Sequence, residues 1–488
     1  MIMKSLLALC LAVLSSATAQ VPLTQKPDIT LHGSVTRADY ETYKELPFTV
    51  PAGVTRISVE YTYDRSQHTV IDIGLLDPQR FRGWAGGAKT FFTVSESDTT
   101  PAFLSGPIVP GTWKILFGIP NIRANTTTNY EVKIWFGHEG DVATVSTFSR
   151  EPLRKGPAWY RGDLHLHDAH SDGKCPNQDG EKVPCPLYNL VLGAVDRGLD
   201  FIAITDHNTT SHFSDMRELQ PYFSHLLLIP GREITTFYGH ANVWGTTDPI
   251  DFRIQHDTAT KDFVRILDRV DALHATISIN HPAHPYGEIC MGCGWTVPNT
   301  PWERIHVLEA INGDDPTKPY SSIPLWESKL NEGHRIAAIG GSDNHTGTEH
   351  EKTGYPTTVV YAQNLSERAI LDGIRAGHDF IDAEGSKTRA IEWTAQAGKQ
   401  TYMMGDALAS PAGAKLTFTL ATRALNGAHP ELIIDGKESQ EFDASDFKGD
   451  VSRTFHYTSD GKRHWLRINI RDTNNKLLIL SNPIYLNF

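Results

Sequence analysis

The sequence predicts an α/β core flanked by two β-sandwich regions, and three observations lead to this fold class. Between residues 20 and 150, short alternating apolar runs are broken by Gly, Pro and Asn, which is typical of a β-sandwich or jelly roll. Between 158 and 388, apolar runs alternate with helix-like stretches, as in repeated β/α units around a parallel sheet or barrel. From 389 to 488 short β runs return, which indicates a second β-sandwich.

The bulk composition is that of a globular protein with several domains. The chain has 488 residues, of which 40% are hydrophobic, so two to four domains are expected. Its formal net charge is −12 and it contains no run of Lys or Arg. This argues against a nucleic-acid-binding surface but leaves room for a small anionic substrate held by a few cations.

Residues 1–19 have the form of a secretory signal peptide. A short cationic start is followed by a brief apolar run and an Ala17-x-Ala19 pattern, which predicts cleavage after Ala19. The apolar run is too short to span a bilayer. The mature protein is therefore expected to be exported, to the periplasm or the medium, and not held in the membrane.

The first β region, 20–150, contains alternating runs at 55–63, 113–117 and 130–136. It shows no compact cluster of catalytic residue types. Two interpretations stay open: a module that binds carbohydrate or a surface polymer, and, with more weight, a packing domain that shields the next region. A polar linker at 149–157, with two prolines, separates it from the α/β core.

Three helix–strand pairs are expected in the core. The pairs are 187–197 with 201–206, 261–273 with 276–280, and 324–332 with 335–341. After residue 389, the β runs at 415–421, 432–434, 464–470 and 477–480 are read as a structural sandwich.

His165 and His167 open the series of candidate metal ligands. They alternate with Leu164 and Leu166, so on a strand both imidazoles face the same side. Asp172 follows on a Ser-Asp-Gly turn. Taken alone, this pattern leaves a strand with two solvent-facing histidines nearly as probable as a metal site.

Six further ligand-type residues stand at or after the ends of expected strands. They are His207, Glu233, His240, His281, Asp343 and His345. The carboxyl ends of strands in a β/α barrel meet at one face, so these side chains should converge. Sixteen of the 22 histidines lie between Ala158 and Phe380, a concentration that scattered surface histidines would not produce. The pattern predicts a metal centre.

Together these motifs resemble the polymerase and histidinol phosphatase (PHP) superfamily. The matching series is Asp-Leu-His-Leu-His with Ser-Asp-Gly, Ile-Thr-Asp-His, Gly-x-Glu with Gly-His, Asn-His-Pro, and Gly-Ser-Asp-Asn-His. It covers about half the chain, from Ala158 to Glu384, and its tail is similar to the carbaryl-hydrolase-like (CehA/McbA) branch. The resemblance implies a distorted (β/α)7 barrel over 158–388 and a di- or trinuclear centre of Zn, Mn or Fe.

The resemblance also assigns the ligands to two or three metal ions. One ion would be held by His165, His167, Glu233 and Asp343, a second by Asp172, His207 and His345, and a third by His240 and His281, with Glu233 bridging. Some relatives have His in place of Asp172.

Other residues beside the motifs are candidates for supporting roles. Asp163 and Asp206 are expected either to orient imidazoles or to make ordinary strand-end hydrogen bonds. His284 is interpreted as a surface histidine, with gating or general acid catalysis as alternatives. Glu309 and Asn312 are expected to face the pocket without binding metal.

After signal cleavage four cysteines are left, namely Cys175, Cys185, Cys290 and Cys293. In an oxidising compartment they are expected to form disulfides at the rim of the site, with three possible connectivities.

A phosphoesterase acting on small phosphate esters through a bridging hydroxide is the leading function. Glu233, Asp343 and His207 would be catalytic, and Arg232 and Lys352, with Lys174 as a further candidate, would grip the phosphate. Hydrolysis of a carboxylic ester, carbamate or amide is the alternative. A non-catalytic surface-binding protein ranks third, since all nine ligand positions are filled.

Overall fold

The computed structural model describes residues 26–488 except 142–147, 150, 291, 314–319 and 347–351. The expected signal peptide lies outside the described residues. Of the helices that the structure describes, none combines the length and apolar character needed to cross a bilayer.

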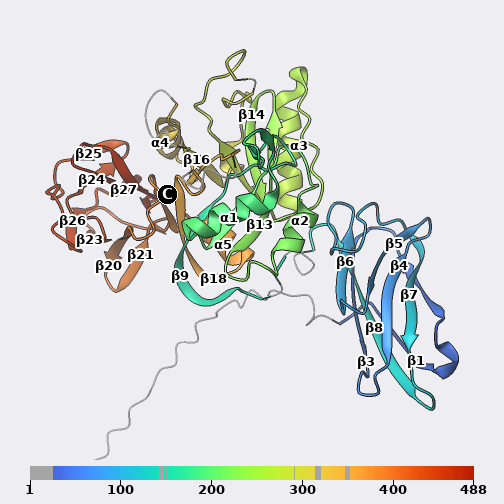
Figure 1. The fold of residues 1–488 in the computed structure, drawn as a ribbon. Helices are drawn as coiled ribbons and strands as arrows, with labels where there is room; N and C mark the ends of the chain where they lie inside the picture. The colour runs from blue at the N-terminus through green and yellow to red at the C-terminus, as the bar shows by residue number, and fades with distance from the viewer. Residues whose placement is uncertain (1–25, 142–147, 150, 291, 314–319, 347–351) are drawn as a thin grey trace, which may run out of the picture.

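The N-terminal region consists of two four-stranded antiparallel sheets that share one core (Figure 1). One sheet has the order β1 (Ile29–Thr36), β8 (Thr127–His138), β3 (Val54–Tyr63), β6 (Phe91–Ser95), and the other has the order β2 (Tyr43–Val50), β7 (Gly111–Asn121), β4 (Val70–Leu76), β5 (Phe81–Gly86). Alternate residues point inward, and Trp113, Ile115 and Phe117 of β7 are wholly buried between the sheets. This period of two puts Lys114, Leu116 and Gly118 on the outer face of β7, where Lys114 and Leu116 are half-buried.

One long mixed sheet runs through the rest of the chain. Its order is β17 (Ala337–Gly341), β16 (Val307–Asn312), β15 (Thr276–Asn280), β14 (Gly239–Trp244), β13 (Leu227–Thr236), β12 (Phe201–Ile204), β9 (Arg154–Asp163), β18 (Thr357–Leu365), β19 (Asp379–Asp382), β28 (Leu477–Ser481), β27 (His464–Arg471), β24 (His429–Ile434), β25 (Lys437–Ser439). The sheet crosses residue 388 without a break, because β19 pairs with β28.

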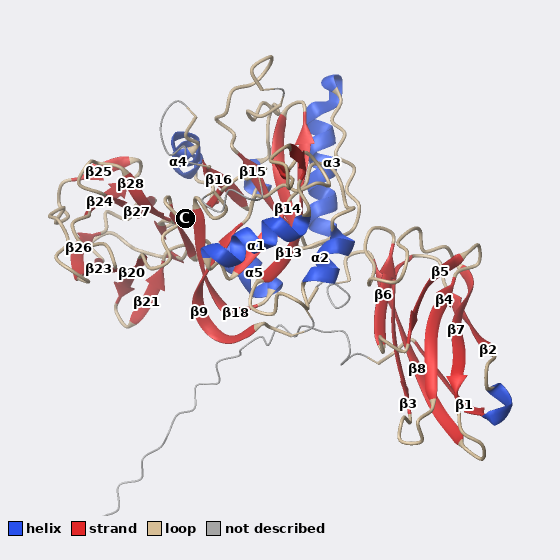
Figure 2. Ribbon diagram, in the orientation of Figure 1, coloured by secondary structure: helices blue, strands red, loops and turns tan. Residues whose placement is uncertain are grey.

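In the part of the chain that the structure describes, five α-helices pack around the central strands (Figure 2). They are α1 (Leu187–Arg197), α2 (Phe213–Leu219), α3 (Ala259–Ala272), α4 (Ile323–Glu332) and α5 (Glu367–Ala376). Gly198, Gly333 and Gly377 end α1, α4 and α5 in the left-handed conformation that favours glycine. Ser366 caps α5, where its side chain accepts a hydrogen bond from the Ala369 N–H.

The expectation of a distorted (β/α)7 barrel is wrong. The structure is mostly β-sheet, with 43% strand and 14% helix. Only four neighbouring pairs in the central part of the sheet are parallel, namely β9/β12, β12/β13, β15/β16 and β16/β17. Antiparallel neighbours β14 and β18 interrupt them, and the described strands form an open sheet that continues into the C-terminal region. A β/α barrel needs a helical crossover at each step, whereas β13 and β14 are joined by a tight turn.

In the C-terminal region a second antiparallel sheet faces the end of the long one. Its order is β21 (Gln400–Met403), β20 (Ala390–Ala397), β23 (Lys415–Arg423), β26 (Ser452–Thr458). Trp393 and Phe418 from this sheet and Leu466 and Ile468 from β27 lie in one buried cluster. Two short strands, β22 (Ala407–Leu408) and β29 (Ile484–Leu486), pair with each other, and β29 also pairs with β27 of the long sheet.

Two disulfides join neighbouring cysteines, Cys175 to Cys185 and Cys290 to Cys293. The first links the hairpin of β10 (Lys174–Pro176) and β11 (Lys182–Pro184) to the loop before α1. Such pairs suit an oxidising, exported environment.

Candidate metal centre

All nine expected ligands lie together at one end of the central strands. They are His165 and His167 after β9, Asp172 on the next turn, His207 after β12, Glu233 in β13, His240 in β14, His281 after β15, and Asp343 and His345 after β17. Leu164 and Leu166 are buried on the opposite side, as the alternation predicts. Antiparallel β14 still delivers a ligand to this end, because His240 stands at its beginning.

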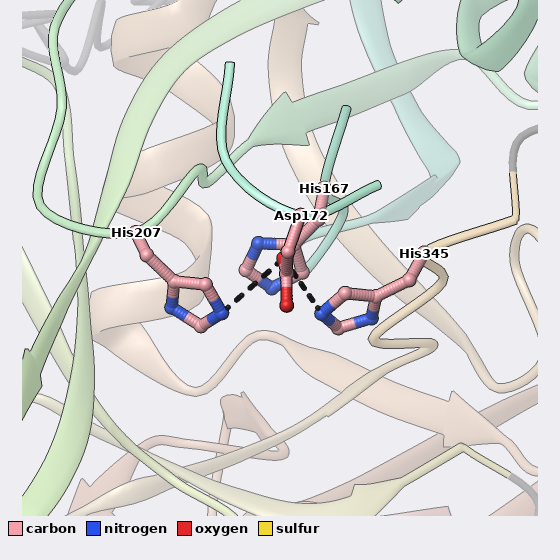
Figure 3. A group of neighbouring side chains, drawn as sticks. All are labelled: His167, Asp172, His207 and His345. Carbon is pink, nitrogen blue, oxygen red and sulfur yellow. Dashed lines mark ion pairs between the residues drawn. The ribbon is translucent and has the colours of Figure 1, made fainter. Parts of the chain in front are cut away.

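Among the described residues, eight of these nine side chains form three groups that could each hold a metal ion, and His240 lies outside these groups. In each group one ligand atom per residue lies within 4.8 Å of the others. The groups are His167, Asp172, His207 and His345 (Figure 3), then His165, His167 and Asp343, and then His165, Glu233 and His281. Neighbouring groups share His167 or His165, so the three positions are adjacent.

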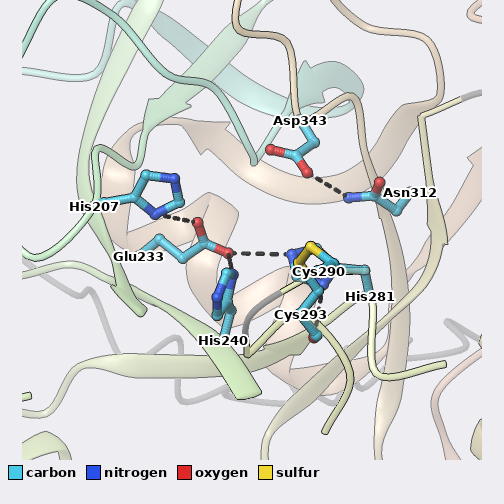
Figure 4. The surroundings of a disulfide bond; sticks show 8 residues. All are labelled: His207, Glu233, His240, His281, Cys290, Cys293, Asn312 and Asp343. Carbon is cyan, nitrogen blue, oxygen red and sulfur yellow. Dashed lines mark hydrogen bonds and ion pairs between the residues drawn. A yellow bond between two sulfur atoms is a disulfide. The ribbon is translucent and has the colours of Figure 1, made fainter. Parts of the chain in front are cut away.

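Glu233 lies at the middle of the buried side of the cluster (Figure 4). One carboxylate oxygen, Oε1, is 3.3 Å from His165 Nε2, 3.3 Å from His240 Nδ1 and 3.4 Å from His281 Nε2. The other, Oε2, is 2.9 Å from His207 Nδ1. Asn280 donates a hydrogen bond of 2.9 Å to Oε1 and so fixes the carboxylate. Both carboxylate oxygens of Glu233 therefore face ring nitrogens of the cluster.

Two ligands are held in a backbone conformation that non-glycine residues rarely adopt. The φ angle is +29° at His281 and +53° at Asp343. Both residues stand where a strand leaves the sheet, and the turn directs their side chains toward Glu233 and His165. Local strain of this kind persists only where the surroundings enforce it, and it is concentrated at functional sites.

The donor atoms fit a metal ion because several of them have no hydrogen-bond partner. Among the described residues, these buried atoms include His165 Nε2, both ring nitrogens of His167 and His240 Nε2. Buried polar atoms are normally hydrogen-bonded, and a cluster of exceptions calls for an explanation. Imidazole nitrogens mixed with carboxylates suit Zn, Mn or Fe.

Three of the imidazoles are oriented so that Nε2 points into the centre. Nδ1 of His165 is 2.9 Å from Glu309 Oε1, Nδ1 of His281 is 3.1 Å from the Cys293 carbonyl oxygen, and Nδ1 of His345 is 2.8 Å from the Asp343 carbonyl oxygen. An imidazole that donates from Nδ1 leaves Nε2 as a lone-pair ligand.

The electrostatics of the cluster keep its carboxylates ionised. Burial raises the pKa of Glu233, but His165 and the other imidazoles outweigh burial and hold that pKa well below its usual value. For His167, burial is the larger influence and lowers the pKa. The hydrogen bond from His345 lowers the pKa of Asp172 to about 2. For His345, burial lowers the pKa, but the hydrogen bond to Asp172 and the charge of Asp343 outweigh burial and raise that pKa to about 9. Metal binds ionised carboxylates and neutral imidazoles, so an ion at His345 would displace a proton.

Glu309 was expected to face the pocket, and the structure gives it a specific role. It is wholly buried within β16 and bonds His165, the His281 backbone N–H at 2.9 Å and Asn312 Nδ2 at 3.0 Å. It therefore aligns two ligands without being one. Sequence reasoning missed Asn280 and Thr235; Thr235 Oγ1 is 2.5 Å from His207 Nδ1. The only signal for Asn280 was its place directly before His281.

Asp163 and Asp206 support the backbone of the site. Asp163 accepts hydrogen bonds from the backbone N–H groups of His165, Ser342 and Gly354. Asp206 accepts from the Asp168 N–H and the Ser171 hydroxyl. Neither is hydrogen-bonded to a ligand imidazole in the structure.

The expected phosphate contacts lie apart from the cluster or at the surface. Arg232 is buried, with its guanidinium over the Phe213 ring and a hydrogen bond to the Thr246 carbonyl. Since side chains alternate along β13, Arg232 and Glu233 point to opposite faces. Lys352 and Lys174 are exposed. His284 stacks on the His281 ring, with centroids 4.9 Å apart, which places it at the mouth of the site.

Comparisons with known proteins give no family for this chain. No family model matches it, and no curated protein matches it. Among solved structures, it is similar to a family two carbohydrate esterase from Cellvibrio japonicus at 10% identity, over 71% of this chain and 97% of that chain. The TM-score is 0.14, so this likeness carries no argument about fold or function.

Proposed function

We propose that this protein is an exported, metal-dependent hydrolase that acts on small phosphate esters. The observation that carries the proposal is the sharing of His165 and His167 between the three ligand groups. Divalent ions held so close together would lower the pKa of a bound water from 15.7 to about 7 and neutralise charge on the attacked group. The likeness of the motifs to PHP hydrolases supports the same reaction class.

The exposure of the ligands indicates where a substrate would enter. The side chains of Asp172, His345 and His207 are 58%, 33% and 25% exposed, whereas those of His165 and His167 are wholly buried. The group at His167, Asp172, His207 and His345 therefore faces solvent, and the group at Glu233 forms the floor. A substrate would meet Asp172 and His345 first, with Glu233 and Asp343 beneath it.

Hydrolysis of a carboxylic ester, carbamate or amide is the second candidate. One observation favours it: the guanidinium of Arg232 points away from the ligands, so it supplies no contact for a phosphate. A neutral substrate needs no such cation, because only its carbonyl oxygen gains charge during attack.

Metal analysis combined with a substrate panel tests the proposal. The purified mature protein should contain two or three divalent ions per chain and should hydrolyse phosphate mono- or diesters. Asp343→Ala should lose at least about 100-fold in turnover, since even residues that only orient ligands are worth about 10–100-fold. Asp257→Ala, at an exposed aspartate, is the matched control.

The outcomes separate the two candidates. Turnover of aryl esters or carbamates alone, with metal bound, would replace phosphate esters by the second class. Full activity in Asp343→Ala, or no bound metal and no turnover, would overturn the hydrolase proposal.

A further inference from the structure

The outer face of the β2-β7-β4-β5 sheet carries a flat aromatic surface far from the metal centre. This sheet lies on the side of the N-terminal region that faces away from the central strands (Figure 1). Trp84 of β5 pairs with Gly74 of β4, Gly74 pairs with Leu116 of β7, and the next pair along β7 is Gly118 with Tyr43 of β2. The four strands thus place Trp84 and Tyr43 on one face.

Two glycines let the Trp84 indole lie flat across the neighbouring strands. A Cβ added at Gly74 would be 2.6 Å from Trp84 Cε3, and one added at Gly118 would be 2.8 Å from Trp84 Cη2. The ring therefore crosses β4 and reaches β7 in direct contact with their backbones. Glycine inside a strand often marks a close approach of this kind. A ring held flat by its inner face presents its outer face to solvent.

The Tyr43 ring lies beside the Trp84 ring and is steeply inclined to it. Its ring is 6.0 Å from that of Trp84 at an interplanar angle of 69°, and the residue is 75% exposed. Polar groups surround the pair: Glu45 and Lys114 form an ion pair at 2.5 Å one row away, and Asp72 pairs with Gly118 on the other side. Aromatic surface and hydrogen-bonding groups thus lie next to each other on this face of the sheet.

We propose that the aromatic pair formed by Trp84 and Tyr43 binds a sugar ring of a neutral polysaccharide. A pyranose has a face of C–H groups that packs on an aromatic ring, and its hydroxyls lie around the edge, where they can pair with carboxylates and an ammonium group. An apolar peptide would not use the surrounding charges. The proposal is independent of the metal centre.

Affinity gel electrophoresis of the full chain tests this inference. The probes are soluble xylan, glucomannan, hydroxyethylcellulose and dextran, each cast into a native gel. At least one polysaccharide should retard the protein. Trp84→Ala should weaken that retention at least about tenfold, and Tyr43→Ala, at an exposed position that leaves the fold intact, should weaken it several-fold. Tyr222→Ala, at an exposed tyrosine of the central region, should change nothing.

Three outcomes would overturn the inference. They are no retardation in any of the four gels, unchanged retention in both Trp84→Ala and Tyr43→Ala, or retention that is lost in Asp343→Ala. The last result would place the polysaccharide at the metal centre. Retention that survives in Asp343→Ala but not in Tyr43→Ala assigns polysaccharide binding to the aromatic pair, whatever reaction the metal centre performs.

Discussion

Two clusters of charged side chains in this protein differ in whether their charges are paired within the chain. The Asp98 cluster, formed by Asp98, Arg56 and Arg217, joins the N-terminal region to α2. Arg56 Nη1 is 2.9 Å from Asp98 Oδ2, and Arg217 Nε is 2.7 Å from Oδ1. Burial raises the pKa of Asp98, but the two guanidinium groups outweigh burial and lower that pKa. Both carboxylate oxygens of Asp98 are paired with cations of the chain itself.

The inner part of the candidate metal centre, at His165, His167 and Glu233, is equally buried, but among the described residues not all of its polar atoms are paired within the chain. Nε2 of His165 and both ring nitrogens of His167 lack a hydrogen-bond partner, although carboxylates lie around them. Burial alone therefore does not distinguish a structural cluster from a functional one. The difference is that the Asp98 cluster contains its own cations, whereas the metal centre presents lone pairs to an ion from outside.

Removing one carboxylate from each cluster gives the largest contrast. Asp98→Ala leaves two buried guanidinium groups without their anion, so we expect a loss of about 3–5 kcal/mol in the free energy of unfolding with metal content unchanged. Glu233→Gln should instead lose bound metal. Urea denaturation and elemental analysis measure both effects; a loss of metal in Asp98→Ala would contradict the comparison.

A smaller effect is expected from Glu309, which belongs to the metal centre without being a ligand. Glu309→Gln weakens the bonds that orient His165 and His281, so metal affinity should fall about 10–100-fold, or about 1.4–2.7 kcal/mol. Competition with a chromogenic chelator measures it. Glu303→Gln, at an exposed position in the short 3-10 helix before β16 (Trp302–Arg304), is the control, and equal affinities in the two variants would rule out an orienting role.

The smallest effect, taken per pH unit, is a pH dependence at the edge of the Asp98 cluster. Burial raises the pKa of Glu367 to about 8; Arg217 and Arg368 oppose this rise, and Asp98 adds to it. An unfolded glutamate titrates near pH ~4.3, so the folded state holds the extra proton. Stability from this group is full at low pH and is lost as the pH rises toward 8, by at most about 1.4 kcal/mol per pH unit. Thermal unfolding of Glu367→Gln between pH 5 and 8 should show a shallower decline; an unchanged slope would assign it to other groups.

The convergence of the nine side chains could be predicted from sequence because its signals are local. Each candidate ligand lies at or near the end of an apolar run. The expected strand 276–280 matches β15, which places His281 directly after that strand. The helix expected at 187–197 matches α1 as well. The apolar periodicity within these short segments was enough to predict both elements.

The barrel was predicted wrongly because strand pairing is not local. No short pattern distinguishes β14, which returns antiparallel to β13 after a tight turn, from a loop that carries His240. The pairing of β19 with β28 joins residues about a hundred positions apart. The contact of Glu309 with His165 depends on the same long-range order, so the sequence could indicate only that Glu309 faces the pocket.

The pairing of β19 with β28 has a consequence for how the chain can be shortened. Without residues 389–488, β19 would become an edge strand whose unpaired N–H and C=O groups could recruit another chain. Truncation at this point would therefore create an aggregation-prone template, although no ligand of the metal centre would be removed. The C-terminal region covers that edge, and β19 depends on it for a hydrogen-bonding partner on this side.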